Sequence, residues 1–398
     1  MLCCDSSMQG PRREVGLAMK QSSRRNFLAA AVSTGALAAG GRSGSNSSAA
    51  GTPIPMVHAT DLYRPHNDPD DHWDLACVYA LAHGGAFDLK AVLIDYPPLK
   101  RDWDPDVMAV AQMNYLTGRA APVLVGAPRA AVSPKEEAAQ PEFAGVRGLL
   151  EILRESQRPV VINIVGSTRD VALASKLEPE LFASKCAAVY LNAGSGTRDV
   201  VRAAKLEYNV ELDPANYAAV FQLPCPVYWM PCFEDFAGEL TVREWGTYYK
   251  FRHDDVLPAL SPRVQNYFLM MYRHGALASG LAEPRGSQWS WLRGLEGPRD
   301  EATFVKQRPL WRNMWCTGGF LHAAGLTVSR AGQIIPLREC RDPAFTFDPI
   351  RVHCAANGVT EWMPQAGETK RYIYHVRDVM SYQAAMTAAL KSLLIRLQ

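Results

Sequence analysis

Residues 61–74 carry enough acidic side chains to bind a divalent cation. Five aspartates lie within these fourteen positions, at 61, 68, 70, 71 and 74. Carboxylates this close repel one another and raise one another's pKa, and a hard cation bound through several of their oxygens removes that cost. The spacing differs from that of an EF-hand, whose final glutamate is also missing. Aspartates also cap helices and favour the helix dipole, so a helix start is the alternative interpretation.

The flanking sequence places this acidic segment between a strand and a helix. Apolar residues 55–59 predict a strand before it, and residues 71–83 predict a helix after it. Short β-rich runs then alternate with helical stretches, which predicts an open, mostly parallel α/β sheet with helices on both faces. Ligand sites of such sheets lie at the carboxyl ends of strands. The further strands are expected at 89–95, 121–126, 159–165, 187–191 and 227–231, and the last helix at 383–397.

Several motifs, in this order, resemble those of the nucleoside hydrolases, which cleave purine or pyrimidine ribonucleosides. They are Thr60-Asp61 with residues 67–71, the strand 121–127, residues 162–173, residues 177–181, and Glu207-Tyr208-Asn209 with Asp213-Pro214. Order and spacing match over residues 55 to about 235, and more weakly over 310–325 and 371–397. The resemblance implies one α/β domain of the nucleoside hydrolase type over residues 53–398.

The resemblance also implies a calcium ion at the bottom of the pocket, holding a water nucleophile and the ribose 2′ and 3′ hydroxyls. It assigns Asp61 and Asp71 as calcium ligands, Asp61 also as the general base, and Asp70 as an acceptor for a ribose hydroxyl. The backbone carbonyl of Arg169 and an oxygen of Asn313 would complete the shell. A divalent cation keeps such carboxylates ionised and lowers the pKa of its bound water, which suits attack on an anomeric carbon.

Glu207 and Asn209 resemble the pair that binds ribose hydroxyls from the opposite wall. Their alternative interpretation is structural, as a charged and a polar residue at a strand end before the helix that starts at Asp213-Pro214.

The chain departs from the family pattern in the loop before Asp70 and in the next strand. Residues 64–66 look inserted, so that Asp68 could replace Asp61 as a calcium ligand. Residues 95–98, Asp-Tyr-Pro-Pro, stand where the family has a Gly-Asn pair that contacts ribose.

A third departure concerns the acid that protonates the leaving group. Arg312-Asn313 stands where the family has His-Asp, and a guanidinium cannot donate a proton at neutral pH. His66, His72 and His322 are the available imidazoles, and each is more typical of a structural or surface histidine.

The predicted function is calcium-dependent hydrolysis of the N-glycosidic bond of a ribonucleoside or related glycoside. One alternative is a sugar- or nucleoside-binding protein that has lost catalysis. Another is a glycohydrolase with a different leaving group, selected by the tryptophans of 287–291 and 311–315. Residues 236–310 predict helices and loops that cover the pocket, with an ordinary peripheral subdomain as the alternative. Neither a phosphate-binding glycine loop nor a G-x-S-x-G motif is present.

Residues 1–50 predict an export signal and a flexible linker. The run from Ser23-Arg24-Arg25 to Leu28 is typical of a twin-arginine signal, Ala36-Leu37-Ala38 suits cleavage, and Met19 is a more typical start than Met1. A chance arginine pair before an alanine-rich helix is the alternative. We expect the twin-arginine machinery to deliver a periplasmic or secreted protein that is free of the membrane after cleavage.

Composition limits the partners and the cofactors. Lys plus Arg, 42, nearly balances Asp plus Glu, 40, so we expect no nucleic-acid partner. The nine cysteines include no CxxC pair, which argues against a structural zinc, and they leave room for one disulfide. The family resemblance leans toward a homodimer or homotetramer.

Overall fold

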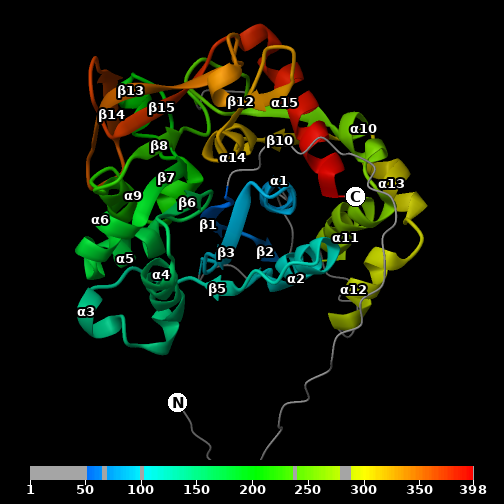
Figure 1. Cartoon of the computed structure of the whole chain (residues 1–398), viewed down its shortest axis with the longest axis horizontal. Helices are drawn as coiled ribbons and strands as arrows, with labels where there is room; N and C mark the ends of the chain where they lie inside the picture. The colour runs from blue at the N-terminus through cyan, green and yellow to red at the C-terminus, as the bar shows by residue number, and fades with distance from the viewer. Residues whose placement is uncertain (1–51, 65–69, 99–102, 236–239, 278–287, 398) are drawn as a thin grey trace, which may run out of the picture. The chain divides into compact units, whose positions relative to one another are not determined.

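The computed structural model describes residues 52–64, 70–98, 103–235, 240–277 and 288–397 (Figure 1). The predicted signal and linker, His66 and Asp68 lie outside the described residues. Residues 49–398 form one compact unit by their internal contacts. None of the helices within the described ranges combines the length and the hydropathy that a bilayer span requires.

One large sheet organises the described residues, with nine strands in the order β14-β13-β15-β8-β7-β6-β1-β3-β5. Its strands from β15 to β5 all run parallel, and β13 and β14 extend it with antiparallel pairing. The predicted open, mostly parallel α/β sheet is therefore confirmed. The parallel strands are β1 (Ile54–Thr60), β3 (Phe87–Ile94), β5 (Val123–Val125), β6 (Val160–Ile164), β7 (Cys186–Asn192), β8 (Val227–Met230) and β15 (Arg371–Val376). The antiparallel strands are β13 (Phe345–Cys354) and β14 (Thr360–Pro364).

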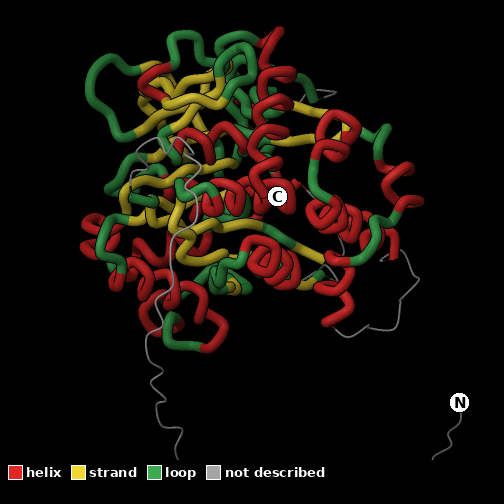
Figure 2. Tube along the Cα trace, turned by 45° about the vertical axis from the view of Figure 1, so that its right-hand side comes forward, coloured by secondary structure: helices red, strands yellow, loops and turns green. Residues whose placement is uncertain are grey.

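Helices cover both faces of the sheet (Figure 2). Neighbouring residues of β1 show this, because Met56 packs into one hydrophobic cluster and Val57 into another. The first cluster holds α1 (Asp70–His83), α2 (Val107–Thr117) and α15 (Val379–Leu394). The second holds α4 (Ala144–Glu155), α5 (Arg169–Leu177) and α9 (Pro214–Val220).

Shorter strands and helices connect the main elements or lie at the periphery of the sheet. The remaining strands are β2 (Tyr63–Arg64), β4 (Asp104–Pro105), β9 (Tyr249–Arg252), β10 (Trp311–Met314), β11 (Leu326–Val328) and β12 (Ile334–Pro336). The remaining α-helices are α3 (Pro134–Glu137), α6 (Pro179–Lys185), α7 (Val200–Ala203), α8 (Tyr208–Leu212), α10 (His253–Val256), α11 (Pro262–Leu277), α12 (Gln288–Glu296), α13 (Glu301–Gln307) and α14 (Thr317–Ala323). Single 3₁₀ turns occupy Pro141–Phe143, Leu257–Ala259, Leu337–Glu339 and Ile395–Leu397.

The chain reverses its direction across the sheet at β1. It proceeds from β1 to β3 and β5 on one side, and then crosses to β6, β7 and β8 on the other. The helix after β1 packs in one cluster and the helix after β6 packs in the other. The two connections therefore diverge and leave a crevice beyond the carboxyl ends of both strands. Ala59 pairs with Ile164, so Asp61 and Val165 emerge side by side at this crevice.

The region predicted as pocket cover, residues 236–310, contains β9 and α10 to α13 in its described parts. Helices α11 and α12 pack on α2. Leu240 is the residue of this region that lines the pocket within the described ranges. The side chains of Trp289 and Trp291 lie outside the described residues.

Buried histidines make the free energy of unfolding depend on pH. His58 in β1 is fully buried, its ring meets Phe320 edge-on at 5.7 Å between centroids, and its Nδ1 lies 3.0 Å from Asn163 Nδ2. Burial lowers the pKa of His58 to about 3. Between that value and the ordinary pKa of about 6.5 the unfolded chain binds the extra proton, so His58 lowers stability as the pH falls.

We therefore expect His58→Gln to flatten the acid side of the stability curve. From pH 6 to pH 4 the wild type should lose about 1.4 kcal/mol per pH unit relative to the variant. Buried carboxyls with raised pKa act in the opposite sense, which is why the difference between the two proteins is the quantity to measure by denaturant unfolding. His83→Gln removes an exposed histidine and is the control. Parallel curves for wild type and His58→Gln would contradict the expectation.

Candidate active site at the carboxyl ends of the strands

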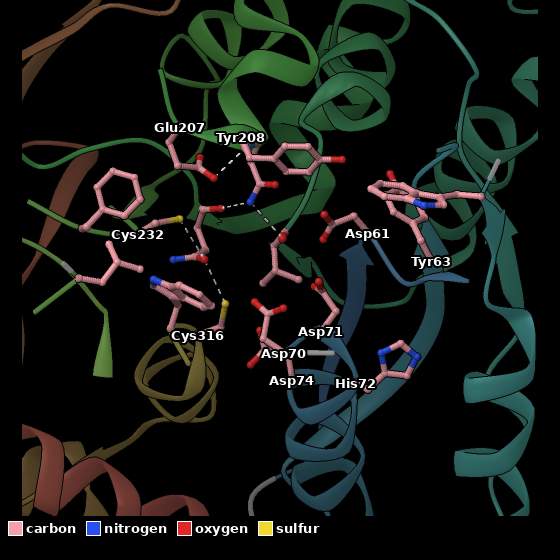
Figure 3. Close-up of a pocket in the computed structure, with 17 residues that line it drawn as sticks. Asp61, Tyr63, Asp70, Asp71, His72, Asp74, Glu207, Tyr208, Cys232 and Cys316 are labelled. Atoms are coloured by element: carbon pink, nitrogen blue, oxygen red, sulfur yellow. Dashed lines mark hydrogen bonds between the residues drawn. The ribbon is translucent and has the colours of Figure 1, made fainter. Parts of the chain in front are cut away.

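A pocket of about 400 Å³ opens at the crevice between β1 and β6. Its floor comes from the carboxyl ends of the parallel strands, with Asp61 after β1, Val165 after β6, Asn192 at the end of β7 and Cys232 after β8. Figure 3 shows the aspartates on one side of the pocket and Glu207 on the other. The fold therefore places the predicted acidic segment at the topological switch point.

Four aspartates, Asp61, Asp70, Asp71 and Asp74, form one wall of the pocket, which we call the acidic wall. Asp61 and Asp71 form its centre. Their side chains are in hydrogen-bond contact, and Thr60 Oγ1 donates to Asp71 Oδ1 at 3.0 Å. Burial raises the pKa of Asp71 well above its usual range, and the charges of Asp61 and Asp70 raise it further. A buried carboxyl in contact with a half-buried one needs a shared proton or a cation.

Asp74 lies one helical turn further along α1 and also lines the pocket. It is 2% exposed, and burial raises its pKa to about 7, opposed by a hydrogen bond from the Cys316 thiol. Its Oδ1 has no hydrogen-bond partner among the described residues. Asp74 is counted among the five clustered aspartates without a site role of its own, although its spacing of four from Asp70 already places the two on one helix face.

Glu207 and Asn209 lie on the opposite wall at the start of α8. The Glu207 carboxylate accepts from the backbone N–H groups of Gly194 at 2.8 Å and Asn209 at 2.9 Å, and so caps the helix. Burial raises the pKa of Glu207 to about 7, and the two backbone hydrogen bonds oppose this shift. Asn209 Nδ2 donates to the carbonyls of Val165 and Asn192, each at 3.2 Å. Both residues line the pocket and also hold its wall together, so their structural role is observed, and ribose binding stays a prediction.

Aromatic rings and thiols complete the lining. Tyr63 and Trp103 stack with ring centroids 5.6 Å apart and planes 30° apart. Cys232 and Cys316 both donate to Asn192 Oδ1, at 3.5 and 3.2 Å. Further aromatic rings on the lining belong to Tyr208, Phe233 and Trp315.

Arg169 does not line the pocket. It opens α5, and its guanidinium donates to Asp213 Oδ2 at 3.2 Å, to the carbonyl of Ala127 at 2.9 Å and to that of Leu212 at 3.0 Å. Because β6 ends at Ile164, the pocket is lined from this turn by Val165, four residues before Arg169.

Asn313 is also placed outside the pocket lining. It lies within β10, where its Oδ1 accepts from the Tyr248 hydroxyl at 2.9 Å. Trp315 and Cys316, which precede α14, reach the pocket instead. Trp311 lies on the surface, 53% exposed, beneath the Lys250 ammonium group.

The described histidines differ in their relation to the pocket. His72 lines it, and its Nε2 lies 3.0 Å from Asp106 Oδ2. His322 lies outside the lining, with its Nδ1 2.8 Å from the Tyr190 hydroxyl, and burial lowers its pKa to about 4.

Asp95, which follows β3, supports the pocket from behind. It is buried outside the lining and accepts a hydrogen bond from the backbone N–H of Ser167. A Cβ at Gly166 would collide with the Asp95 carboxylate and would lie 2.9 Å from the backbone nitrogen of Asp61. Glycine at this position therefore allows the β1 and β6 ends to approach each other.

The chemistry of the lining fits a cation held by few charged ligands. Among the described residues, no three His, Cys, Asp or Glu side chains are arranged to share one metal ion. Asp61 and Asp71 are the acidic pair in contact, and the carbonyl of Val165 is a neutral oxygen at the same floor. Calcium accepts such mixed sets of carboxylate, carbonyl and water oxygens.

No family model matches the sequence, and no curated protein matches it. Solved structures similar to this chain include the Inosine-Guanosine Nucleoside Hydrolase, at 14% identity over 86% of this chain and 98% of that one, with a TM-score of 0.47. The plant nucleoside hydrolase PpNRh1 is 14% identical over 86% and 99%, with a TM-score of 0.48. The type III effector protein XopQ, complexed with adenosine diphosphate ribose, is 14% identical over 86% and 93%, with a TM-score of 0.42. Similarities at this level do not establish a shared activity.

Proposed function

We propose that this protein hydrolyses the N-glycosidic bond of a ribonucleoside or a related glycoside, with water as the nucleophile. The observation that carries the proposal is the contact between Asp61 and Asp71 on one wall of a pocket that has Glu207 and Asn209 on the other. The motifs that contain these residues are also the ones that resemble the nucleoside hydrolases.

The residues of the acidic wall divide the chemical work. Asp61 takes the proton of the attacking water, and Asp70 accepts a hydrogen bond from a sugar hydroxyl. Asp71, fixed by the hydrogen bond from Thr60, adds negative charge near the sugar. That charge stabilises the oxocarbenium-like transition state as the carbon–nitrogen bond breaks, and its electron pair leaves with the base. Asn209 on the opposite wall orients the sugar, which reduces the entropic cost of the reaction.

Asp61, Asp71 and the Val165 carbonyl would hold a calcium ion in this pocket. The Val165 carbonyl takes the place that the family resemblance assigns to the Arg169 carbonyl, because Val165 lines the pocket and Arg169 does not. Calcium bound there would keep both carboxylates ionised and lower the pKa of a bound water.

The proposal predicts release of free sugar from at least one common nucleoside. Purified full-length protein is incubated with calcium and a panel of purine and pyrimidine ribonucleosides, and free reducing sugar is measured. Asp70→Asn, which removes one sugar contact, should raise KM and lower kcat/KM by about tenfold to a hundredfold. Release from no nucleoside, together with calorimetric binding of ribose, would support a binding protein without catalysis.

A further inference from the structure

The pocket lining is strongly acidic. Five of the residues that line it carry carboxyl groups, and within the described part of the chain none of the lining residues is lysine or arginine. A divalent ion at Asp61 and Asp71 leaves Asp70, Asp74 and Glu207 on the walls. A ligand with positive charge reduces the repulsion among these groups when it binds.

Asp74 shows most directly where such a charge would lie. The Cys316 thiol is within reach of both Asp74 and Asn192, and its single proton serves one acceptor at a time. Asp74 Oδ1 has no partner among the described residues, although the side chain is 2% exposed and lines the pocket. A buried carboxylate oxygen without a partner is costly unless a ligand supplies a donor or a positive charge.

The aromatic side chains favour a ligand that is both planar and positively charged. The stacked pair of Tyr63 and Trp103 and the rings of Tyr208 and Trp315 all lie on the lining. The faces of tyrosine and tryptophan attract cations, and they also stack on planar rings. A planar aromatic cation satisfies the aromatic and the acidic parts of the lining together.

We propose that the glycoside cleaved in this pocket carries a positively charged aromatic aglycone, such as an N-ribosylated pyridinium or an N7-alkylated purine. This inference rests on the proposed function and adds the charge class of its leaving group.

The reaction balances without a protonated acid. The water oxygen bonds to the anomeric carbon, and its proton goes to Asp61. The electron pair of the carbon–nitrogen bond goes to the ring nitrogen, which neutralises the ring, so that a neutral heterocycle departs. Arg312, at the position where the family pattern has its leaving-group acid, lies outside the pocket lining, and a cationic ring does not require that acid.

The test compares glycosides that differ in charge. Nicotinamide riboside and nicotinic acid riboside share the sugar and the pyridinium bond, but the second has a carboxylate that cancels the net charge. Guanosine and 7-methylguanosine form a second pair, each rate being divided by its uncatalysed rate. We expect kcat/KM with the full-length wild type to be about tenfold or more higher for the cation of each pair. Equal values, or a preference for the uncharged member, would overturn the inference.

Hydrolysis of neither pair would count against the proposed function, and binding then decides the inference. Calorimetry with the same four glycosides should give a dissociation constant about tenfold lower for each cation. Equal or undetectable binding would overturn the inference as well.

Asp74→Asn tests the residue that carries the argument. This isosteric change should lower the cation-to-neutral ratio of kcat/KM by about tenfold. Asp170→Asn is the matched control, because Asp170 is equally buried, 2% exposed, and lies outside the lining; its ratio should equal that of wild type. If Asp74→Asn fails to fold, the salt dependence of the wild type is measured instead. Screening by salt should lower kcat/KM for the cationic glycoside more than for its neutral partner. An unchanged ratio in the folded variant, or equal salt effects, contradicts the inference.

Discussion

Asp61→Asn should lower kcat/KM of the hydrolysed glycoside by about a thousandfold or more. Asparagine keeps the shape of the side chain, and its amide cannot accept the proton of the attacking water. The Gly166 turn and the Thr60–Asp71 hydrogen bond stay in place, so thermal unfolding should show a folded variant. Initial rates of sugar release at several substrate concentrations give the ratio.

Asp95→Asn is the control for Asp61→Asn. Asp95 is buried close to Asp61 but does not line the pocket. An amide oxygen at position 95 can still accept the hydrogen bond from the backbone N–H of Ser167. We expect it to retain activity within about tenfold of wild type. If Asp61→Asn kept wild-type activity, the general base would have to be another residue.

Removing calcium should destabilise the wild type, and Asp71→Asn should abolish this effect. At a calcium concentration of a hundred times the dissociation constant, binding adds about 2.7 kcal/mol to the free energy of unfolding. Without metal, we expect Asp71→Asn to be more stable than the wild type. The pKa of Asp71 is raised above its unfolded value, so its ionised form lowers stability at neutral pH, and asparagine removes that charge.

Thermal unfolding of both proteins, with calcium and with EDTA, measures the stabilisation by calcium and the effect of the Asp71 charge without metal. The wild type should melt lower in EDTA, whereas Asp71→Asn should melt at one temperature in both and above the metal-free wild type. Asp88→Asn, outside the pocket lining, controls for the loss of one acidic charge. A wild type that is indifferent to EDTA would remove the calcium site from the proposal.

The central parallel strands β6 and β7 are predictable from sequence because nearly all of their residues are buried, whereas β15, which is also parallel, was not among the expected strands. Residues 159–165 and 187–191 were expected as strands, and the structure has β6 at Val160–Ile164 and β7 at Cys186–Asn192. The antiparallel edge is different. In β13 exposed and buried residues mix around Pro349, so no continuous apolar run marks this strand.

The final helix also begins earlier than expected. α15 starts at Val379, because Asp378 caps it by accepting from the backbone N–H of Met380 at 3.0 Å. The apolar period alone, which begins further on, does not show the first turn.

The predicted site residues fall into two groups. Asp61, Asp70, Asp71, Glu207 and Asn209 all line the pocket, because each stands beside a strand end or a helix start that the sequence marks well. Their roles stay proposals until the variants are measured.

Arg169 and Asn313 belong to the second group, which the structure places outside the lining. Their assignment came from matching the family motifs, and a shift of a few residues in that match moves an oxygen away from the pocket. No sequence motif marks Val165 or Cys316 as a pocket residue, because neither a backbone carbonyl nor a single cysteine forms a recognisable pattern. Their place becomes visible only when β6 and α14 are packed beside β1.

The neighbouring positions of β1 and β6 also have a consequence for synthesis of the chain. Asp61 leaves the ribosome long before Val165, and Cys232 and Cys316 follow later still, yet all four line one pocket. Pairing of strands so distant in sequence is slow to nucleate, so the aspartates remain hydrated, without an opposite wall, while translation continues. A fragment that stops after β8 would keep every aspartate of the acidic wall and lack Cys316. Such a fragment would therefore present a complete set of pocket aspartates in an incomplete pocket lining.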